Sequence, residues 1–336
     1  MADDSLYTRE EQLKDTSAQR PHLVILGAGA SRAACPTGDK KGCILPLMCD
    51  TVKTLDLGKH LKRAGVPYAR KNFELVYAAI AANPSLQELK QLVESRVAEY
   101  FGTLELPEKP TVYDYLVLSL RHKDVIATFN WDPFLVQAFQ RNHRRVTFPQ
   151  VLFLHGCSIV GSCMTDKKQG IVGHRCPVCG HLYTPTRLLY PVRDKDYVSD
   201  PYIASQWKSL SGFLGAAFLV TIFGYGAPDS DAAAIDLMSK AWGSPEEREL
   251  EEIEIIDIKA EDTLRSKWDR FIHSHHYQVH GSYFESILAN YPRRSVEAYW
   301  QSLIEARFRE ENPVPLTDSF SALWDWFSQL TMHEKT

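Results

Sequence analysis

Five short apolar runs, each ended by a glycine or a polar residue, constrain the fold of this chain more than any other feature. They span residues 22–26, 125–128, 151–154, 217–223 and 254–258. A short run that is apolar at most consecutive positions is typical of a strand buried on both faces, as in a parallel sheet. Segments with helical spacing separate the runs, among them residues 111–120 and 133–139. Strands that alternate with helices predict an α/β fold, a doubly wound, Rossmann-like parallel sheet.

The runs also suggest how the chain is divided into domains. Residues 1–20 are polar, and we expect a flexible N-terminal arm. Residues 21–265 hold the predicted strands, with a helical insert at about 50–120 and a cysteine-rich, zinc-ribbon-like insert at about 157–185. Residues 266–336 have helical spacing over 296–308 and 320–330, which predicts a helical C-terminal extension.

Composition excludes several classes of function. The net charge of −4 offers no positive field for nucleic acid, so direct nucleic-acid binding is not expected. The longest apolar stretch, residues 213–223, is shorter than the ~20 residues that a membrane span requires. The N-terminus lacks the basic start and apolar run of a secretory signal. We therefore expect a cytoplasmic protein without a membrane segment.

The first apolar run ends in a glycine turn, Gly27-Ala28-Gly29-Ala30-Ser31. Glycines after a buried strand let the backbone approach a pyrophosphate closely. Arg32 holds the third position of the Gly-x-Gly-x-x-Gly pattern, and no acidic residue stands at a clean strand end about 20 residues on. Nucleotide binding and a plain strand–helix turn both fit this segment, and a conventional dehydrogenase is disfavoured.

Polar residues follow the second and third runs. Asn130 and Asp132 come after residues 125–128, and His155 follows residues 151–154. Ligands of open parallel sheets bind beyond the carboxyl ends of strands, where these side chains would project. Asn130 could hold a ribose hydroxyl or a water, and His155 suits general-base or ribose-contact work. Alternatively, Asn130 and Asp132 cap the helix over 133–139, and His155 is structural.

The cysteines give the strongest spacing signal. Cys176-Pro-Val-Cys179 is typical of a zinc knuckle, in which two thiolates on a tight turn bind one tetrahedral metal ion. Cys157 and Cys163 would complete a structural Zn²⁺ site, although His174 or His181 could replace one of them. The alternative is a set of unmetallated thiols.

In their order along the chain, these segments resemble the sirtuin family over roughly residues 20–260. The glycine turn resembles its phosphate-binding segment, Thr128-Phe-Asn-Trp-Asp132 its Thr-Gln-Asn-Ile-Asp segment, and His155-Gly156 its catalytic His-Gly pair. The cysteine insert falls directly after that histidine, where sirtuins carry a zinc ribbon. The resemblance implies NAD⁺ as substrate, with the residues arranged as follows: Asn130, His155 and Asp132 in catalysis, and Gly27, Ala28, Gly29, Ser31, Thr128, Gly224 and Asp257 in NAD⁺ binding.

Two departures from the family refine the expected activity. The chain lacks the Gly-Ile-Pro-x-Phe-Arg segment of deacetylating sirtuins after the glycine turn, and Gly224-Tyr-Gly-Ala-Pro-Asp229 looks like the loop of sirtuin-like antiphage-defence proteins. That branch destroys NAD⁺, which implies hydrolysis to nicotinamide and ADP-ribose. NAD-dependent lysine deacylation and a non-catalytic NAD or ADP-ribose binding subunit are the alternatives. The resemblance also implies a homo-oligomer or a partner such as a HerA-type ring ATPase.

Overall fold

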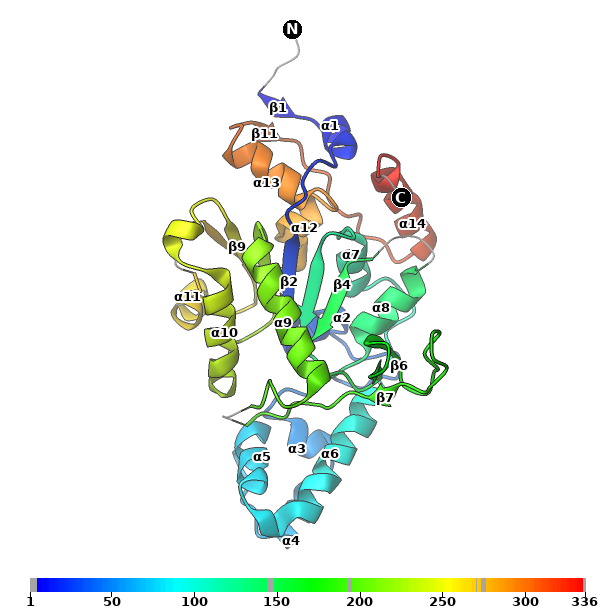
Figure 1. Cartoon of the computed structure of the whole chain (residues 1–336), viewed down its shortest axis with the longest axis vertical. Coiled ribbons are helices and arrows are strands. Elements are labelled where there is room, and N and C mark those ends of the chain that lie inside the picture. The colour runs from blue at the N-terminus through cyan, green and yellow to red at the C-terminus, as the bar shows by residue number, and fades with distance from the viewer. Residues whose placement is uncertain (1–4, 144–147, 193–194, 270, 273–275, 335–336) are drawn as a thin grey trace.

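The computed structural model describes residues 5–143, 148–192, 195–269, 271–272 and 276–334. Its centre is a six-stranded parallel sheet (Figure 1). The strand order is β10 (Tyr277–His280), β9 (Glu252–Ile256), β8 (Leu219–Phe223), β2 (His22–Leu26), β3 (Val125–Thr128) and β4 (Gln150–Phe153). The predicted α/β, doubly wound parallel sheet is thus confirmed.

The sequence located the interior strands well because they are buried along their whole length. Every residue of β2, β3, β8 and β9 is buried, which accounts for their apolar runs. The edge strand β10 was missed, since none of its four residues is fully buried and its sequence, Tyr-Gln-Val-His, is half polar. The helical C-terminal extension expected over residues 266–336 therefore also contains a strand, because β10 belongs to the main sheet.

Helices cover both faces of the sheet, and the alternation of strand side chains divides the core between them. On one face, Val24, Leu26 and Ile126 pack against α2 (Ala28–Ala34), α7 (Val112–Leu118) and α8 (Phe134–Asn142). On the other face, Leu23 and Ile25 pack against α9 (Pro201–Ala216), α10 (Ala232–Trp242) and α11 (Glu261–Trp268). The short helices η2 (Asp229–Asp231) and η3 (Pro245–Glu247) flank α10.

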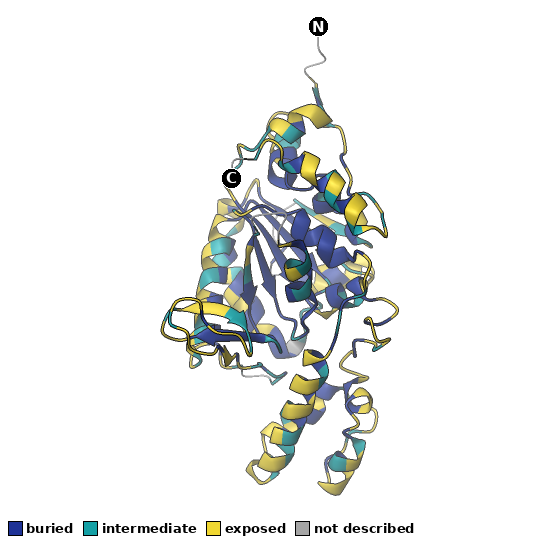
Figure 2. Ribbon diagram, turned by 90° about the vertical axis from the view of Figure 1, so that its right-hand side faces the viewer, coloured by how far each residue is buried: buried dark blue, intermediate teal, exposed yellow. Residues whose placement is uncertain are grey.

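The helices between α2 and α7 form a lobe that extends away from the sheet at its carboxyl edge (Figures 1 and 2). It consists of α3 (Thr51–Thr54), α4 (Gly58–Arg63), α5 (Phe73–Ala81), η1 (Pro84–Leu86) and α6 (Gln87–Gly102). Only the inward sides of its helices are buried, for example at Phe73, Val93 and Val97. We call residues 51–102 the helical lobe.

The cysteine-rich segment forms a small antiparallel sheet beside the main one. Its strands are β5 (Val160–Cys163), β6 (Lys168–Ile171) and β7 (Thr184–Pro185), in the order β6–β5–β7. We call residues 157–186 the cysteine module. Its first strand begins only a few residues after β4, so its position is fixed relative to the end of that strand.

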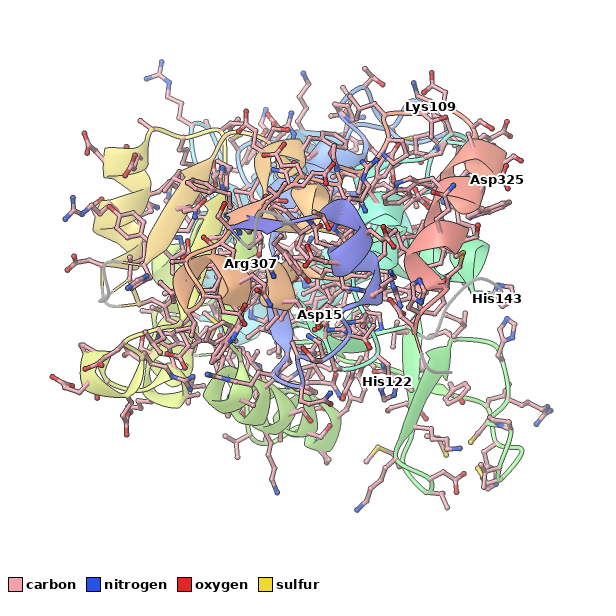
Figure 3. The ribbon with its side chains drawn as sticks, turned by 90° about the horizontal axis from the view of Figure 1, so that it is seen from above. Asp15, Lys109, His122, His143, Arg307 and Asp325 are labelled. Carbon is pink, nitrogen blue, oxygen red and sulfur yellow. The ribbon has the colours of Figure 1, made fainter. Side chains whose placement is uncertain are left out.

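The two chain ends meet on the side of the sheet opposite the helical lobe (Figure 1). There β1 (Leu6–Tyr7) pairs in parallel with β11 (Phe308–Arg309), and Thr8 caps α1 (Arg9–Lys14). Residues 5–20 are thus not the flexible arm expected from their polar composition. Seen from above (Figure 3), Arg307 lies near this segment, and it forms an ion pair of 2.9 Å with Glu11.

Three helices complete the C-terminal part. They are α12 (Ile287–Asn290), α13 (Ser295–Leu303) and α14 (Phe320–Thr331), preceded by η4 (Tyr283–Glu285). Helix α14 contributes Leu323, Phe327 and Leu330 to the core, as its helical spacing predicted. Within the described ranges, no helix combines the length and apolar character needed to cross a membrane.

Candidate functional site

The carboxyl ends of the central strands meet at one edge of the sheet. Leu26 pairs with Thr128 and with Phe223, and Thr128 pairs with Phe153. The chain proceeds from β2 to β3 and β4 on one side, then returns to β8, β9 and β10 on the other. The neighbouring strands β2 and β8 therefore define the topological switch point, where open α/β sheets bind their ligands.

Three glycines fill this switch point by backbone packing. A Cβ atom on Gly29 would lie 2.7 Å from the Cα of Gly224, and one on Gly27 would lie 2.6 Å from the Gly224 carbonyl oxygen. Gly224 has a φ of +62°, and its carbonyl accepts a 2.9 Å hydrogen bond from the Gly29 amide. The glycines thus hold the two halves of the sheet edge together. Ala28, which begins α2, is exposed beside them.

Asn130 lies two residues beyond β3 and turns its side chain toward the glycine turn. Its Nδ2 donates to the Gly27 carbonyl at 2.8 Å and to Ser31 Oγ at 3.0 Å. Its own amide donates to Thr128 Oγ1 at 3.0 Å, so Thr128 supports the turn. These contacts leave Asn130 Oδ1 without a hydrogen-bond partner among the described residues, and this atom is the one that can hold a ligand or a water.

Asp132 supports Asn130 through Ser31. Ser31 Oγ donates to Asp132 Oδ2 at 2.7 Å, and Asp132 Oδ1 accepts from the Phe134 amide at 3.2 Å. Ser31 is fully buried, so in this structure it belongs to the Asn130 network rather than to an open phosphate cradle. Burial of the carboxyl group raises the pKa of Asp132 to about 6. Through the Phe134 amide, Asp132 is also bonded to the first residue of α8, whose N-cap position is Pro133.

Tyr113, on α7, completes this network and had no signal in the sequence. Its hydroxyl lies 2.7 Å from Ser31 Oγ and 3.2 Å from Asn130 Nδ2. Because the single Ser31 proton goes to Asp132, the Tyr113 hydroxyl must donate to Ser31. Tyr113 is 1% exposed, and its burial raises its pKa, so the phenol remains protonated.

His155 lies at the end of β4, close to the Asn130 turn. The loops after β3 and β4 are joined by two contacts: Ser158 N donates to the Trp131 carbonyl at 2.9 Å, and Cys157 Sγ contacts the Asp132 carbonyl at 3.5 Å. His155 is 6% exposed, and its burial lowers the pKa of the imidazole to about 4. Its Nε2 is buried without a hydrogen-bond partner among the described residues. The imidazole is therefore neutral at physiological pH and has an unused polar atom.

An aromatic group surrounds His155, and the sequence did not identify it. Phe129 lies edge-on to the imidazole with ring centroids 4.8 Å apart, and it stacks on Tyr225 at 4.1 Å. The ring of Tyr197 is nearly parallel to the imidazole, with centroids 6.0 Å apart. The Tyr225 hydroxyl donates to Asp231 Oδ2 at 2.7 Å.

A buried ion pair between Lys195 and Asp231 adjoins the aromatic group. Lys195 Nζ also donates to the Ser230 carbonyl at 2.8 Å, and both charged side chains are almost fully buried. The two charges act on His155 in opposite directions, because Asp231 raises its pKa and Lys195 lowers it. Burial is the largest cause of the lowered histidine pKa.

Asp257 lies apart from these residues. It follows β9, and its Oδ1 accepts from the Lys259 amide at 3.0 Å. Gly224 and Asp257 both lie at the carboxyl edge, on the β8–β9 side of the switch point. The structure thus brings Asn130, Asp132, Ser31 and Thr128 into one network and places Asp257 on the other half of the edge.

A cavity of about 470 Å³ lies between the helical lobe and the chain that follows the cysteine module. It is lined by residues of α5 and α6 on one side and by Leu189 and Lys195 on the other. The Leu189 amide donates to the His155 carbonyl at 3.0 Å, and Lys195 forms the ion pair with Asp231. This cavity therefore adjoins the backbone that packs on His155.

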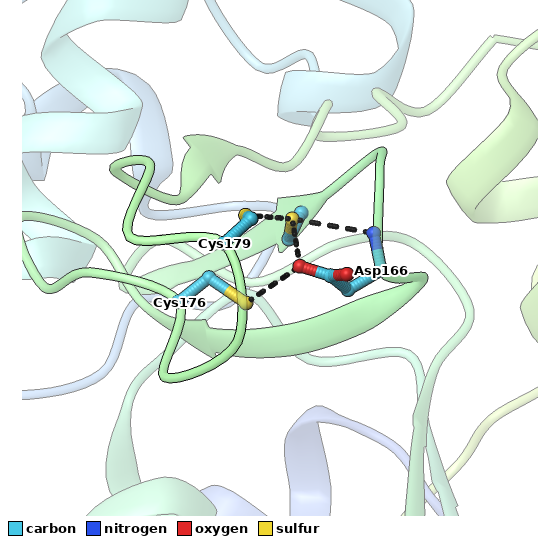
Figure 4. A group of neighbouring side chains, drawn as sticks. Asp166, Cys176 and Cys179 are labelled. Atoms are coloured by element: carbon cyan, nitrogen blue, oxygen red, sulfur yellow. Dashed lines mark hydrogen bonds between the residues drawn. The ribbon is translucent and has the colours of Figure 1, made fainter.

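Four side chains of the cysteine module form a candidate metal centre (Figure 4). Cys163, Asp166, Cys176 and Cys179 place their ligand atoms within 4.8 Å of one another. Asp166 Oδ2 lies 3.4 Å from Cys163 Sγ and 3.2 Å from Cys176 Sγ. Three thiols and a carboxylate suit a tetrahedral Zn²⁺ ion, which would cross-link the turn after β5 to the Cys176–Cys179 turn.

The predicted ligand set differs from this group at one position. Cys157 contacts Asp132 rather than the other cysteines, and its burial raises the pKa of the thiol to about 12. Asp166 takes its place, and the exposed His174 and His181 are not in the group. Sequence spacing alone gave no reason to choose this aspartate.

No protein-family model matches the chain, and no curated protein matches it. Solved structures similar to it include a serine-to-alanine mutant of a Sir2 homologue with ADP-ribose, at 15% identity and a TM-score of 0.41, covering 86% of this chain and 97% of that one. A Sir2 homologue–NAD complex has 15% identity and a TM-score of 0.39, covering 86% and 94%. Sir2 bound to acetylated peptide has 13% identity and a TM-score of 0.38, covering 85% and 93%. Because these TM-scores lie below 0.5, we base the functional proposal on the residues of this chain.

Proposed function

We propose that this protein hydrolyses NAD⁺ at the bond between nicotinamide and ribose, releasing nicotinamide and ADP-ribose. One observation carries the proposal. At the carboxyl edge, beside the glycine turn, a neutral His155 with an unpartnered, buried Nε2 lies next to the loop that holds Asn130. This placement agrees with the motif order that resembles sirtuins.

The proposed reaction requires the protein mainly to position the ribose and a water molecule. The bond between the nicotinamide nitrogen and ribose C1′ breaks with its electron pair leaving on nicotinamide, through an oxocarbenium-like state. A water molecule forms the new C–O bond at C1′ and releases its proton to the solvent. Asn130 Oδ1 would position the ribose or this water. Ser31, Asp132 and Tyr113 would hold the Asn130 side chain in its orientation.

His155 would contact the ribose. A histidine with a pKa of about 4 is uncharged at neutral pH and is a weak base. Its neutral Nε2 can nevertheless accept a hydrogen bond from a sugar hydroxyl if it lacks a proton. This favours a ribose contact over proton removal from the attacking water as the main role of His155.

The nucleotide would extend along the switch point. Exposed Ala28, with Gly27 and Gly29, would lie against the phosphates, and Gly224 and Asp257 would be toward the adenosine half. Thr128 would act through the Asn130 turn rather than by direct contact with NAD⁺, because its hydroxyl already accepts a hydrogen bond from the Asn130 amide.

We further propose a role in antiphage defence by NAD⁺ depletion. The support is the Gly224–Asp229 sequence, which looks like the corresponding loop of that sirtuin-like branch. A homo-oligomer, or a complex with a HerA-type ring ATPase, would then be the working form. Nicotinamide release measured with and without such a partner tests this part of the proposal.

The central test is nicotinamide release from NAD⁺ by the purified protein, with and without an acyl-lysine peptide. Asn130→Ala and His155→Ala should lose most turnover. Their matched controls, Asn83→Ala at the cap of η1 and His122→Ala at an exposed position, should keep it.

Each outcome selects one activity. Release without peptide that is lost in Asn130→Ala supports the hydrolase. Release only with peptide would replace it by a deacylase. NAD⁺ binding without release, even with partners, would replace it by a binding subunit. Full turnover in a folded Asn130→Ala protein would remove Asn130 from the site.

A further inference from the structure

A cavity within the helical lobe is larger than the one beside the cysteine module, and the proposed function does not use it. Its volume is about 780 Å³, which lies in the range of cavities that bind small molecules. Its lining residues all lie between 49 and 75, in or next to α3, α4 and α5 (Figure 1). None of them belongs to the Asn130 network or to the group around His155, so the cavity is a separate site.

Three cationic side chains line this cavity without anionic partners. Lys53, Arg70 and Lys71 form no ion pair and no side-chain hydrogen bond with any residue that the structure describes. One acidic residue, Asp56, lines the cavity with them. Between residues 51 and 73 the sequence has six lysines and arginines against this single acid, although the whole chain has a net charge of −4. Positive charge is therefore concentrated around the cavity, where an anionic ligand can neutralise it.

The cavity beside the cysteine module differs in this respect. It also has three cationic lining residues, but two of them are neutralised by acidic side chains. Lys195 pairs with the buried Asp231, and Lys90 lies 3.8 Å from Glu94. The unpaired charge of the lobe cavity is thus not a general property of hollows on this chain.

An aromatic and apolar wall faces the same cavity. Tyr68 packs over the start of α4, where a Cβ on Gly58 would lie 3.2 Å from the Tyr68 hydroxyl, so glycine leaves room for the ring. This hydroxyl donates no hydrogen bond within the described ranges. Leu75 also lines the cavity and is 57% exposed. The lining therefore offers contacts for a flat apolar group beside the cations.

We propose that the cavity of the helical lobe binds a nucleoside polyphosphate. Lys53, Arg70 and Lys71 would hold the phosphates, because lysine and arginine are the side chains that proteins use for phosphate oxygens. The base would pack against Tyr68 and Leu75. A nucleic-acid strand would require a basic groove with several stacking rings, whereas the lining contains one aromatic residue. The site goes beyond the proposed hydrolysis of NAD⁺ and does not depend on it.

The test compares two pairs of substitutions that change the net charge equally. Lys53→Gln with Lys71→Gln removes two cations from the cavity, whereas Lys59→Gln with Lys62→Gln removes two exposed cations of α4 that do not line it. ATP, GTP and inorganic tripolyphosphate are titrated into the full-length protein by calorimetry. We expect the cavity pair to bind ATP or GTP at least about tenfold more weakly than the wild type, and the control pair to stay within about twofold. All four lysines are exposed, so unchanged thermal unfolding of both variants should show that they fold.

A third variant separates a nucleotide from bare phosphate. Leu75→Ala should weaken nucleotide binding roughly fivefold, because the base loses part of its apolar contact, and should leave tripolyphosphate binding unchanged. The wild type should also bind the nucleotide more tightly than tripolyphosphate. Equal affinity for the two, with no effect of Leu75→Ala, would overturn the assignment of a nucleotide.

The remaining outcomes decide whether the cavity is the site. Binding that is unchanged in the cavity pair would place the nucleotide elsewhere, such as at the switch point, and would overturn the proposal. An equal loss in both pairs would overturn it in favour of general attraction to the lobe. A wild type that binds none of the three probes would overturn it outright. A single-stranded oligonucleotide that binds more tightly than ATP, and weakens equally in both pairs, would replace the nucleotide site by a nucleic-acid surface. Nicotinamide release is unaffected by these results, so the hydrolase is judged by its own test.

Discussion

The buried carboxyl group of Asp132 predicts a stability difference that depends on pH. Replacing it by asparagine, in Asp132→Asn, keeps the shape of the side chain and removes the titration. Burial raises the pKa of Asp132 from 3.8 to about 6 in the folded protein. A displacement of about two pH units corresponds to about 3 kcal/mol of free energy between the two protonation states.

The sign follows from the direction of the pKa change. The folded carboxyl group binds its proton more tightly than the unfolded one, so ionisation destabilises the fold. The destabilisation is absent below about pH 4, grows as pH rises, and is complete above about pH 6. Between those limits, the wild type should lose about 3 kcal/mol relative to Asp132→Asn. Any loss of hydrogen bonds to Ser31 or Phe134 in the variant adds a constant that does not depend on pH.

The assay is urea unfolding of both proteins from pH 4 to 7.5 at constant ionic strength. The quantity to plot is the difference between their free energies of unfolding. The lowered pKa of His155 makes both proteins less stable as pH falls from about 6.5 toward 4, and the subtraction cancels that effect. A difference that stays constant within about 0.5 kcal/mol would refute the reasoning, because it would show that the Asp132 carboxylate is solvated or compensated in the folded state.

Three further predictions concern the metal, the switch point and the Asn130 network. Cys163→Ser should lose bound zinc, measured by elemental analysis, whereas Cys157→Ser should keep the zinc content of the wild type; loss in both would return Cys157 to the ligand set. Gly224→Ala should lower the free energy of unfolding by at least about 2 kcal/mol, because its φ is +62° and the new Cβ would lie 2.2 Å from the Ala30 amide nitrogen. Normal stability in a denaturant titration would contradict this packing. Tyr113→Phe should cost about 1–2 kcal/mol by the same titration, since Ser31 and Asn130 lose a buried partner, and an unchanged midpoint would argue against the network.

The sequence predicted the features that depend on continuous burial. Strands β2, β3 and β8 are buried on both faces, so their apolar runs marked them. The ends of β3 and of the run at β4 placed Asn130 and His155 at one edge. The edge strand β10 was missed because a half-exposed strand needs no apolar run. The polar arm was misjudged because the pairing of β1 with β11 uses backbone hydrogen bonds, which polar residues form equally well.

The rest of the candidate site depends on contacts between distant segments. Tyr113 reaches Asn130 from a helix, and Tyr197 reaches His155 from the chain beyond the cysteine module. No spacing rule connects such pairs, because tertiary packing alone brings them together. Asp166 was missed for a related reason: cysteine spacing identifies a knuckle, but a carboxylate ligand has no pattern of its own.

The cysteine module leaves the sheet and returns to it at a single junction. The Arg187 carbonyl oxygen would lie 2.2 Å from a Cβ on Gly156, and the Leu189 amide bonds the His155 carbonyl. A chain excursion whose two ends adjoin can be lengthened, shortened or exchanged without altering the spacing of the strands around it. His155 is part of that junction, because its carbonyl accepts a hydrogen bond from the Leu189 amide. Different modules inserted there would therefore change the position of the histidine through its backbone, while the sheet stayed the same.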